Sequence, residues 1–294
     1  MQLPTTVLLK MLLMFTGASA GIEQPALMQD DSPGALQPEA PPHEPSEGTA
    51  SRNFADASEL LEALETADAG LERLVANIRY TKAFAIQGDT QTRAGRLVFI
   101  NAAPESEVQA RKFAIRFDSL ITGTRVDEQV QEYVFDGEWL AERYPDEHQF
   151  IRRQVVPPGE RWDPLRIGEG PFPVPLGQKR EDILREYDAE LLPSEDGLES
   201  ATLRAFAAAC WQLRLTPRAE LAEDAELAEI RLWYQKSDLL PRLARTVNSA
   251  DDVSVVQLTE VRTNAEAAIS DGELSTEPPP AEEGWSQTIE PWRG

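Results

Sequence analysis

The feature that most constrains the fold is a strand-rich run between Ile78 and Val156. Its hairpin segment, Tyr133–Leu140, contains Asp136-Gly137 between two apolar stretches. An Asp-Gly pair supplies the positive φ angles of a two-residue type I′ turn at little steric cost. The segment therefore predicts two antiparallel strands joined by a tight turn.

Alternation extends the same pattern to the neighbouring segments. In Lys112–Asp118, the side chains of Phe113, Ile115 and Phe117 fall on one face of a strand. Polar or Gly-bearing connectors separate the predicted strands, as a meander requires. The expected strands are 78–86, 93–101, 112–120, 130–135, 138–144 and 149–156, followed by 203–215, 228–235, 240–248 and 253–263.

Two helices are expected beside these strands. The folded part begins near Phe54, where Asp56 or Ser58 can cap the first helix and Gly70 can divide it. Its apolar positions follow a roughly helical spacing; they are Leu60, Leu61, Leu64, Leu71, Leu74 and Val75. The second spans Arg180–Leu192, with an apolar stripe of Ile183, Leu184, Tyr187 and Leu191.

The N-terminus has the pattern of an export signal. Residues 1–20 carry one charge, Lys10, beside a short apolar stretch, and Ala18-Ser-Ala20 is a small-x-small cleavage site. The alternative is a membrane anchor, although the apolar stretch is far below the ~20 residues that span a bilayer. Cleavage would leave a soluble chain outside the cytoplasm.

Composition sets the remaining boundaries. Residues 21–53 are rich in Pro, Glu, Ser and Gly and contain no Phe, Tyr or Trp, so we expect a disordered linker. One folded domain should follow over 54–276, and 277–294 returns to the composition of a tail. Within the domain, the long Pro-rich segment 157–178 either packs over the sheet or forms a lid over a ligand; its apolar residues include Trp162, Phe172 and Val174.

Charge and chemistry exclude several functions. The chain has 51 acidic and 28 basic residues, and its net charge of −23 repels nucleic acid. Its single cysteine, Cys210, lies in an apolar run and is expected to be a buried small hydrophobe. His148 is the only histidine of the predicted domain, without a metal-spaced or nucleophile motif. We expect no enzymatic activity, no metal and no cofactor.

The order of these motifs resembles the LolA-like family of outer-membrane lipoprotein carriers. The resemblance covers about 54–280, including Gly95–Phe99, Val134–Leu140, Leu213–Pro217, Ile230–Tyr234 and Val256–Asn264. It implies a mainly β fold with some α, an open antiparallel half-barrel sheet covered by helices. It also implies a periplasmic, non-catalytic carrier that shelters the acyl chains of lipoproteins or other lipids in an apolar cavity. On this resemblance we expect a monomer that works with an inner- or outer-membrane transfer partner.

The cavity hypothesis names specific side chains. The candidates are Leu97, Phe99, Phe113, Ile115, Phe117, Trp139, Trp211 and Trp233, with Trp162, Phe172 and Val174 on the lid. For each of them, packing in an ordinary core is the alternative. An envelope sensor or protein-interaction module on the same fold is the alternative function, using a sheet edge or the long loop.

The signal sequence generates a direct prediction. We expect the exported protein to begin at Gly21, because Ala18-Ser-Ala20 precedes that residue. Sequencing the N-terminus of exported protein measures this. A chain that keeps Met1 and stays with the membrane fraction would favour the anchor instead.

Overall fold

The structure is a computed structural model that describes residues 53–101, 111–157, 179–270 and 272–292. The expected signal peptide, nearly all of the expected linker and the expected lid segment with Trp162, Phe172 and Val174 lie outside these residues. No helix in the described part of the chain combines the length and apolarity needed to cross a membrane.

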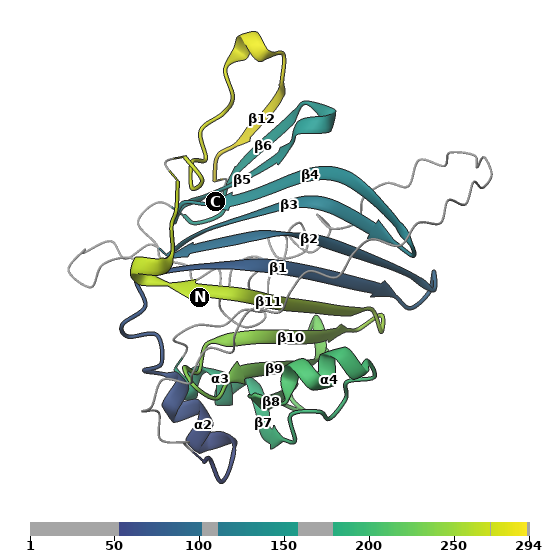
Figure 1. The fold of residues 1–294 in the computed structure, drawn as a ribbon, viewed down its shortest axis with the longest axis vertical. Helices are drawn as coiled ribbons and strands as arrows, with labels where there is room; N and C mark the ends of the chain where they lie inside the picture. The colour runs from purple at the N-terminus through teal and green to yellow at the C-terminus, as the bar shows by residue number, and fades with distance from the viewer. Residues whose placement is uncertain (1–52, 102–110, 158–178, 271, 293–294) are drawn as a thin grey trace, which may run out of the picture. The chain divides into compact units, whose positions relative to one another are not determined.

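Twelve strands form one sheet in the described residues (Figure 1). They are β1 Arg73–Phe84, β2 Asp89–Ile100, β3 Lys112–Thr122, β4 Arg125–Phe135, β5 Trp139–Tyr144, β6 Gln149–Gln154, β7 Tyr187–Leu192, β8 Cys210–Pro217, β9 Leu227–Gln235, β10 Pro241–Asn248, β11 Val253–Thr263 and β12 Ser286–Glu290. The order across the sheet is β12-β6-β5-β4-β3-β2-β1-β11-β10-β9-β8-β7. Two antiparallel meanders, β1–β6 and β7–β11, therefore join where β1 pairs with β11.

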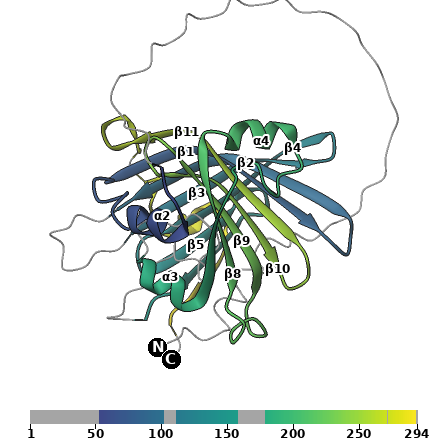
Figure 2. The same ribbon diagram turned by 90° about the horizontal axis from the view of Figure 1, so that it is seen from below.

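The predicted fold class is confirmed. The sheet is open, it does not close into a barrel, and all neighbouring strands are antiparallel except β12, which runs parallel to β6 at one edge. Three α-helices are described: α2 Ala57–Leu64, α3 Arg180–Glu186 and α4 Ala201–Ala207. In Figure 2, α2 and α3 lie close together beside edge strand β7, and α4 lies apart from them at the top of the view.

Register assigns each side chain to one of two faces. On β3, Phe113, Ile115 and Phe117 lie opposite Phe135, Tyr133 and Gln131 of β4, so these six share one face. We call this the inner face, because the α2 end of the chain reaches it through a ring contact of Phe54 with Trp211 at 5.4 Å. The opposite side is the outer face.

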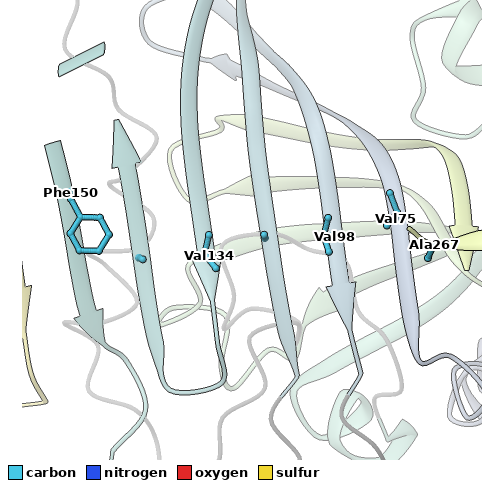
Figure 3. Close-up of a cluster of buried hydrophobic side chains, with 7 residues drawn as sticks. Val75, Val98, Val134, Phe150 and Ala267 are labelled. Atoms are coloured by element: carbon cyan, nitrogen blue, oxygen red, sulfur yellow. The ribbon is translucent and has the colours of Figure 1, made fainter. Parts of the chain in front are cut away.

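The chain's own C-terminal segment covers part of the outer face. A buried row crosses the six strands β1 to β6 (Figure 3) and consists of Val75, Val98, Ala114, Val134, Ala141 and Phe150, with Ala267 against it. Ile269, Leu274 and Trp285 pack onto this row. The segment then continues into β12, where the Glu290 carboxylate accepts from Arg153 Nε at 2.8 Å. Trp285 thus helps to fix the C-terminal segment, which had the composition of a tail.

Helix α4 covers the outer face of the other meander. Its cluster contains Leu198, Ala207, Cys210, Trp233 and Leu243, with Leu203, Phe206 and Val255 at the margin. Ser200 caps the helix by accepting from Leu203 N at 3.4 Å. The outer-face side chains of the first meander are therefore buried under the C-terminal segment, and those of the second meander under α4.

The helix predictions were only partly right. The first helix ends at Leu64, and Asp56 is its N-cap, as expected, with Glu59 N donating at 3.0 Å. Leu74 and Val75 belong to β1, because strand pairing on both sides outweighs their helical spacing. The predicted helix 180–192 stops at Glu186, and its second half is the edge strand β7.

Two further expectations were wrong in detail. The predicted strand 203–215 begins as helix α4 and becomes β8 only at Cys210. In the β4–β5 hairpin, Asp136 N donates to Trp139 O at 3.2 Å, so Gly137 and Glu138 are the central turn residues. Gly137, with φ of 109°, supplies a positive φ in this turn, and Asp136 is not at positive φ, so no type I′ turn forms with Asp136-Gly137 at its centre.

Asn264 fastens the end of β11 to the start of β1. Its Oδ1 accepts from Glu72 N at 2.8 Å and Arg73 N at 3.3 Å, and its Nδ2 donates to Gly70 O at 2.8 Å. Its φ of 50° lies in the left-handed region, which asparagine tolerates better than most residues. One side chain thus serves three backbone groups far away in the sequence.

Replacing Asn264 should therefore lower the free energy of unfolding. We expect Asn264→Ala to cost about 2–3 kcal/mol from lost hydrogen bonds and left-handed strain. Asn264→Gly keeps the backbone conformation and should cost about 1 kcal/mol less. Urea denaturation measures both, with the exposed Asn77→Ala as a control expected within about 0.5 kcal/mol of wild type. Equal denaturation midpoints for Asn264→Ala and Asn77→Ala would show that the three hydrogen bonds of the Asn264 side chain contribute nothing to stability.

Candidate functional site

The inner face carries apolar side chains across both meanders of the described sheet. In the first meander it carries Leu74, Ile78, Leu97, Phe99, Phe113, Ile115, Phe117, Phe135 and Leu140. In the second it continues through Val256, Leu258, Ala244, Ile230, Leu232, Leu213 and Leu215. Alternation along each strand produces this face, because every second residue is apolar and register aligns these residues across strands.

Six of the eight predicted cavity residues meet on this face. Phe99 lies opposite Phe113, and Leu97 lies opposite Ile115, on the paired strands β2 and β3. Phe117 completes the β3 row, and all five side chains are buried. Trp211, half-buried, lies on the inner face of β8 opposite Tyr234.

The other two predicted residues lie on the outer face. Trp233 is fully buried in the α4 cluster, and its Nε1 donates to Ser194 O at 2.7 Å. Trp139 pairs with Gln154 at the hairpin, where the Arg152 guanidinium stacks 4.5 Å from its ring. The alternation of side chains along each strand therefore places these two tryptophans on the opposite face from the other candidates.

Polar groups occupy the inner face towards the β1–β2 and β3–β4 hairpins. Tyr80 Oη lies 3.2 Å from Ser254 Oγ, and Tyr133 Oη donates to Gln131 Oε1 at 3.4 Å. Burial raises the pKa of Tyr133 to about 12, so its hydroxyl stays protonated at neutral pH. Arg93 and Lys82 share this region, since Arg93 pairs with Tyr80 and Lys82 with Gln91.

Glu142 is the buried carboxylate of this face. Burial raises its pKa, while Arg153 and the Tyr144 hydroxyl oppose the rise by favouring the ionised form. Arg153 Nη1 donates to it, and Tyr144 Oη donates at 2.9 Å. These partners satisfy Glu142, so it forms part of a structural network.

Sequence analysis missed Arg93, Lys82 and Glu142 as inner-face residues. The alternation of side chains along each strand could have placed them. Lys82 is an even number of residues from Ile78 and Tyr80, and Arg93 is an even number from Leu97 and Phe99, so each points to the same face as those residues. Their polar character concealed the pattern. In the described part of the chain no group of three or more His, Cys, Asp or Glu side chains is arranged to hold a metal ion.

Comparison with known proteins places this sheet beside several solved structures. No family model matches the chain, and no curated protein matches it. An uncharacterized conserved protein from Thermus thermophilus is similar, with 13% identity and a TM-score of 0.41 over 80% of this chain and 99% of that one. A LolA superfamily protein from Nitrosomonas europaea has 12% identity and a TM-score of 0.32 over 76% of this chain and 98% of that one.

A third similar structure is the MucA/MucB complex of Pseudomonas aeruginosa. The matched chain has 16% identity and a TM-score of 0.38, over 74% of this chain and 60% of that one. Solved structures similar to this chain thus include a LolA superfamily protein, the group that the ordered sequence motifs resemble.

Cys210 is the one nucleophilic thiol of the chain, and its surroundings predict low reactivity. It is buried in the α4 cluster, and burial raises its pKa to about 11. At pH 8 only about one thiol in a thousand would then be thiolate, the reactive form. We expect native protein to resist Ellman's reagent at pH 8 and denatured protein to react rapidly with one equivalent. Rapid labelling of the native protein would contradict this burial.

Proposed function

We propose that the protein is a non-catalytic carrier that shelters acyl chains of lipoproteins or other lipids against its inner face. The observation that supports this most is the extent of that face, which is apolar from β5 across to β8. The cavity-lining residues are Leu97, Phe99, Phe113, Ile115, Phe117 and Trp211. Export with cleavage after Ala20, a periplasmic location and an envelope transfer partner belong to the same proposal.

The short length of the described helices supports a cover over the inner face that a ligand can displace. Helix α2 has eight residues and α3 has seven, so each is only about 10–12 Å long. The inner face spans ten strands from β5 to β7, or about 45 Å at the usual strand spacing. Regular helices of the described part therefore cover only a fraction of it. Helix packing alone does not account for so wide an apolar face.

The energetics favour such a face for an acyl chain. Each buried methylene contributes about 0.8 kcal/mol, so a ten-carbon chain gains about 8 kcal/mol before costs. Association entropy and displacement of the existing cover offset part of this. A broad face without directional contacts then gives binding that remains reversible, which a carrier needs in order to release its cargo.

A protein-interaction module is the second candidate, and the β6 edge favours it. Strand β12 adds to that edge in parallel, from Ser286 opposite Gln149 to Glu290 opposite Arg153. The four residues 286–289 are exposed, so backbone pairing contributes more than burial to their attachment. A sheet edge that pairs with one extended segment through backbone hydrogen bonds can pair in the same way with a strand of a partner protein.

Two phenylalanines offer a matched test of the carrier proposal. Phe117 on the inner face and Phe150 on the outer face are both 0% exposed, so either change to alanine should destabilise by about 3–5 kcal/mol. Only Phe117→Ala should weaken binding of the neutral ligand 1-decanol, by about tenfold, because only Phe117 would contact the chain. Displacement of N-phenyl-1-naphthylamine at low temperature measures binding, and circular dichroism confirms that each variant is folded.

The outcomes separate the two candidate functions. A selective loss in Phe117→Ala supports the carrier. Equal losses in both variants would trace the effect to stability alone. A wild-type protein that binds no decanol, and from which no lipid can be extracted, would contradict the carrier and leave the interaction module.

A further inference from the structure

Two cationic side chains are buried on the inner face without an acidic partner. Arg93 is 6% exposed and Lys82 is 9% exposed. Neither makes an ion pair within 4.0 Å with any carboxylate of the described residues. Other sheet arginines of this chain do make such pairs: Arg143 with Glu132, Arg153 with Glu142, and Arg231 and Arg245 with Glu229. Arg73, Arg79 and Lys112 of the same sheet also lack such pairs, but they are exposed, whereas Arg93 and Lys82 are buried.

Hydrogen bonds leave most of their donors unused. Arg93 Nη1 donates to Gln129 Oε1 at 2.9 Å, which is its one side-chain hydrogen bond within the described part of the chain. A guanidinium has five N–H donors, and an ammonium has three. The Lys82 Nζ lies 4.7 Å from the Phe84 ring and donates no hydrogen bond to a described residue. The unused donors of Arg93 and Lys82 are not among the fully buried, unpartnered side-chain atoms of the described residues, so an incoming anion can reach them.

The acid that acts on Arg93 is Glu147, and it does so without forming an ion pair with the guanidinium. Asp252 acts on Lys82 only at a distance, and its Oδ1 accepts from Ala85 N at 3.0 Å. Glu142 is held by Arg153 and Tyr144. Desolvation lowers the pKa of both Arg93 and Lys82, which is the direction expected of cations that lack a close anion.

Position links the two cations to the apolar face. Arg93 and Lys82 are diagonal neighbours on β2 and β1, a spacing of roughly 7–8 Å that one phosphate or carboxylate group can bridge. Towards the other end of β2, on the same face, lie Leu97 and Phe99. The inner face thus changes from apolar to cationic along the strand direction, as an amphiphile changes from chain to head.

We propose that Arg93, assisted by Lys82, binds the anionic headgroup of a single-chain amphiphile whose acyl chain lies on the inner face. The proposal rests on the carrier function and narrows its ligand to acyl chains with a phosphate or carboxylate head. Arg93 is suited to this because its planar fork presents paired donors to such an oxyanion. A neutral chain would leave both cations without a partner.

The test compares ligands that share a chain or a head. Decyl phosphate carries both parts, 1-decanol carries the chain, and inorganic phosphate carries the head. Wild type should bind decyl phosphate about tenfold or more tightly than decanol, and inorganic phosphate far more weakly than either. Arg93→Gln should remove the advantage of decyl phosphate and leave decanol binding within about twofold. Arg79→Gln is the matched control, since Arg79 is exposed on the outer face of β1, and it should change neither affinity.

Each result has a separate meaning. If wild type binds neither amphiphile, the carrier function fails. If it binds both equally and Arg93→Gln alters neither, the carrier stands and the headgroup site is overturned. Inorganic phosphate bound as tightly as decyl phosphate would also overturn the headgroup site, in favour of a free anion. If Arg93→Gln does not fold, Lys82→Gln is measured instead and should weaken decyl phosphate alone, by about threefold or more; no change there would overturn the proposal.

Discussion

The pairing of β1 with β11 is the constraint on which the rest of the structure depends. It runs from Leu74 opposite Thr263 to Ala83 opposite Val253 and joins two meanders that would otherwise be separate sheets. Its partners lie far apart in the sequence, so its formation carries a large loop-closure cost. Asn264 secures one end of the pairing through three backbone groups. Only when this pairing forms does the inner face become continuous.

The apolar side chains on the two faces of the sheet are covered in different ways. The outer face is covered by segments of the chain close to it, with α4 over one meander and Ala267, Ile269, Leu274 and Trp285 over the other. The inner face is wider than its described helices and carries a continuous set of large apolar side chains, among them Phe99, Phe113 and Phe117. A face covered by firmly attached neighbours contributes to stability, whereas a wide apolar face can also serve a ligand. This asymmetry makes the inner face, and not the outer, the place to look for function.

Sequence alternation predicted most of the strands because a half-buried strand must repeat every two residues. It correctly grouped Phe113, Ile115 and Phe117. It could not place Trp139 and Trp233, because the face of an isolated aromatic depends on the register with its neighbours. The helical pattern of 180–192 predicts helix for residues 187–192 because their local preference suits either state, and only pairing with β8 makes them a strand. The local pattern thus predicts where most strands lie, while register and long-range pairing determine which face of the sheet each side chain occupies.

The charge distribution sharpens what the cationic end of the inner face can do. A net charge of −23 repels anions at long range, and this repulsion is screened beyond about 8 Å at physiological ionic strength. Arg93 and Lys82 act inside that range and in a partly desolvated setting, where attraction is stronger than in water. The acidic surface would then discourage free anions, which have no apolar chain to add affinity. An anionic amphiphile overcomes the repulsion with its chain and gains the local attraction with its head, so selectivity arises from the combination of the two.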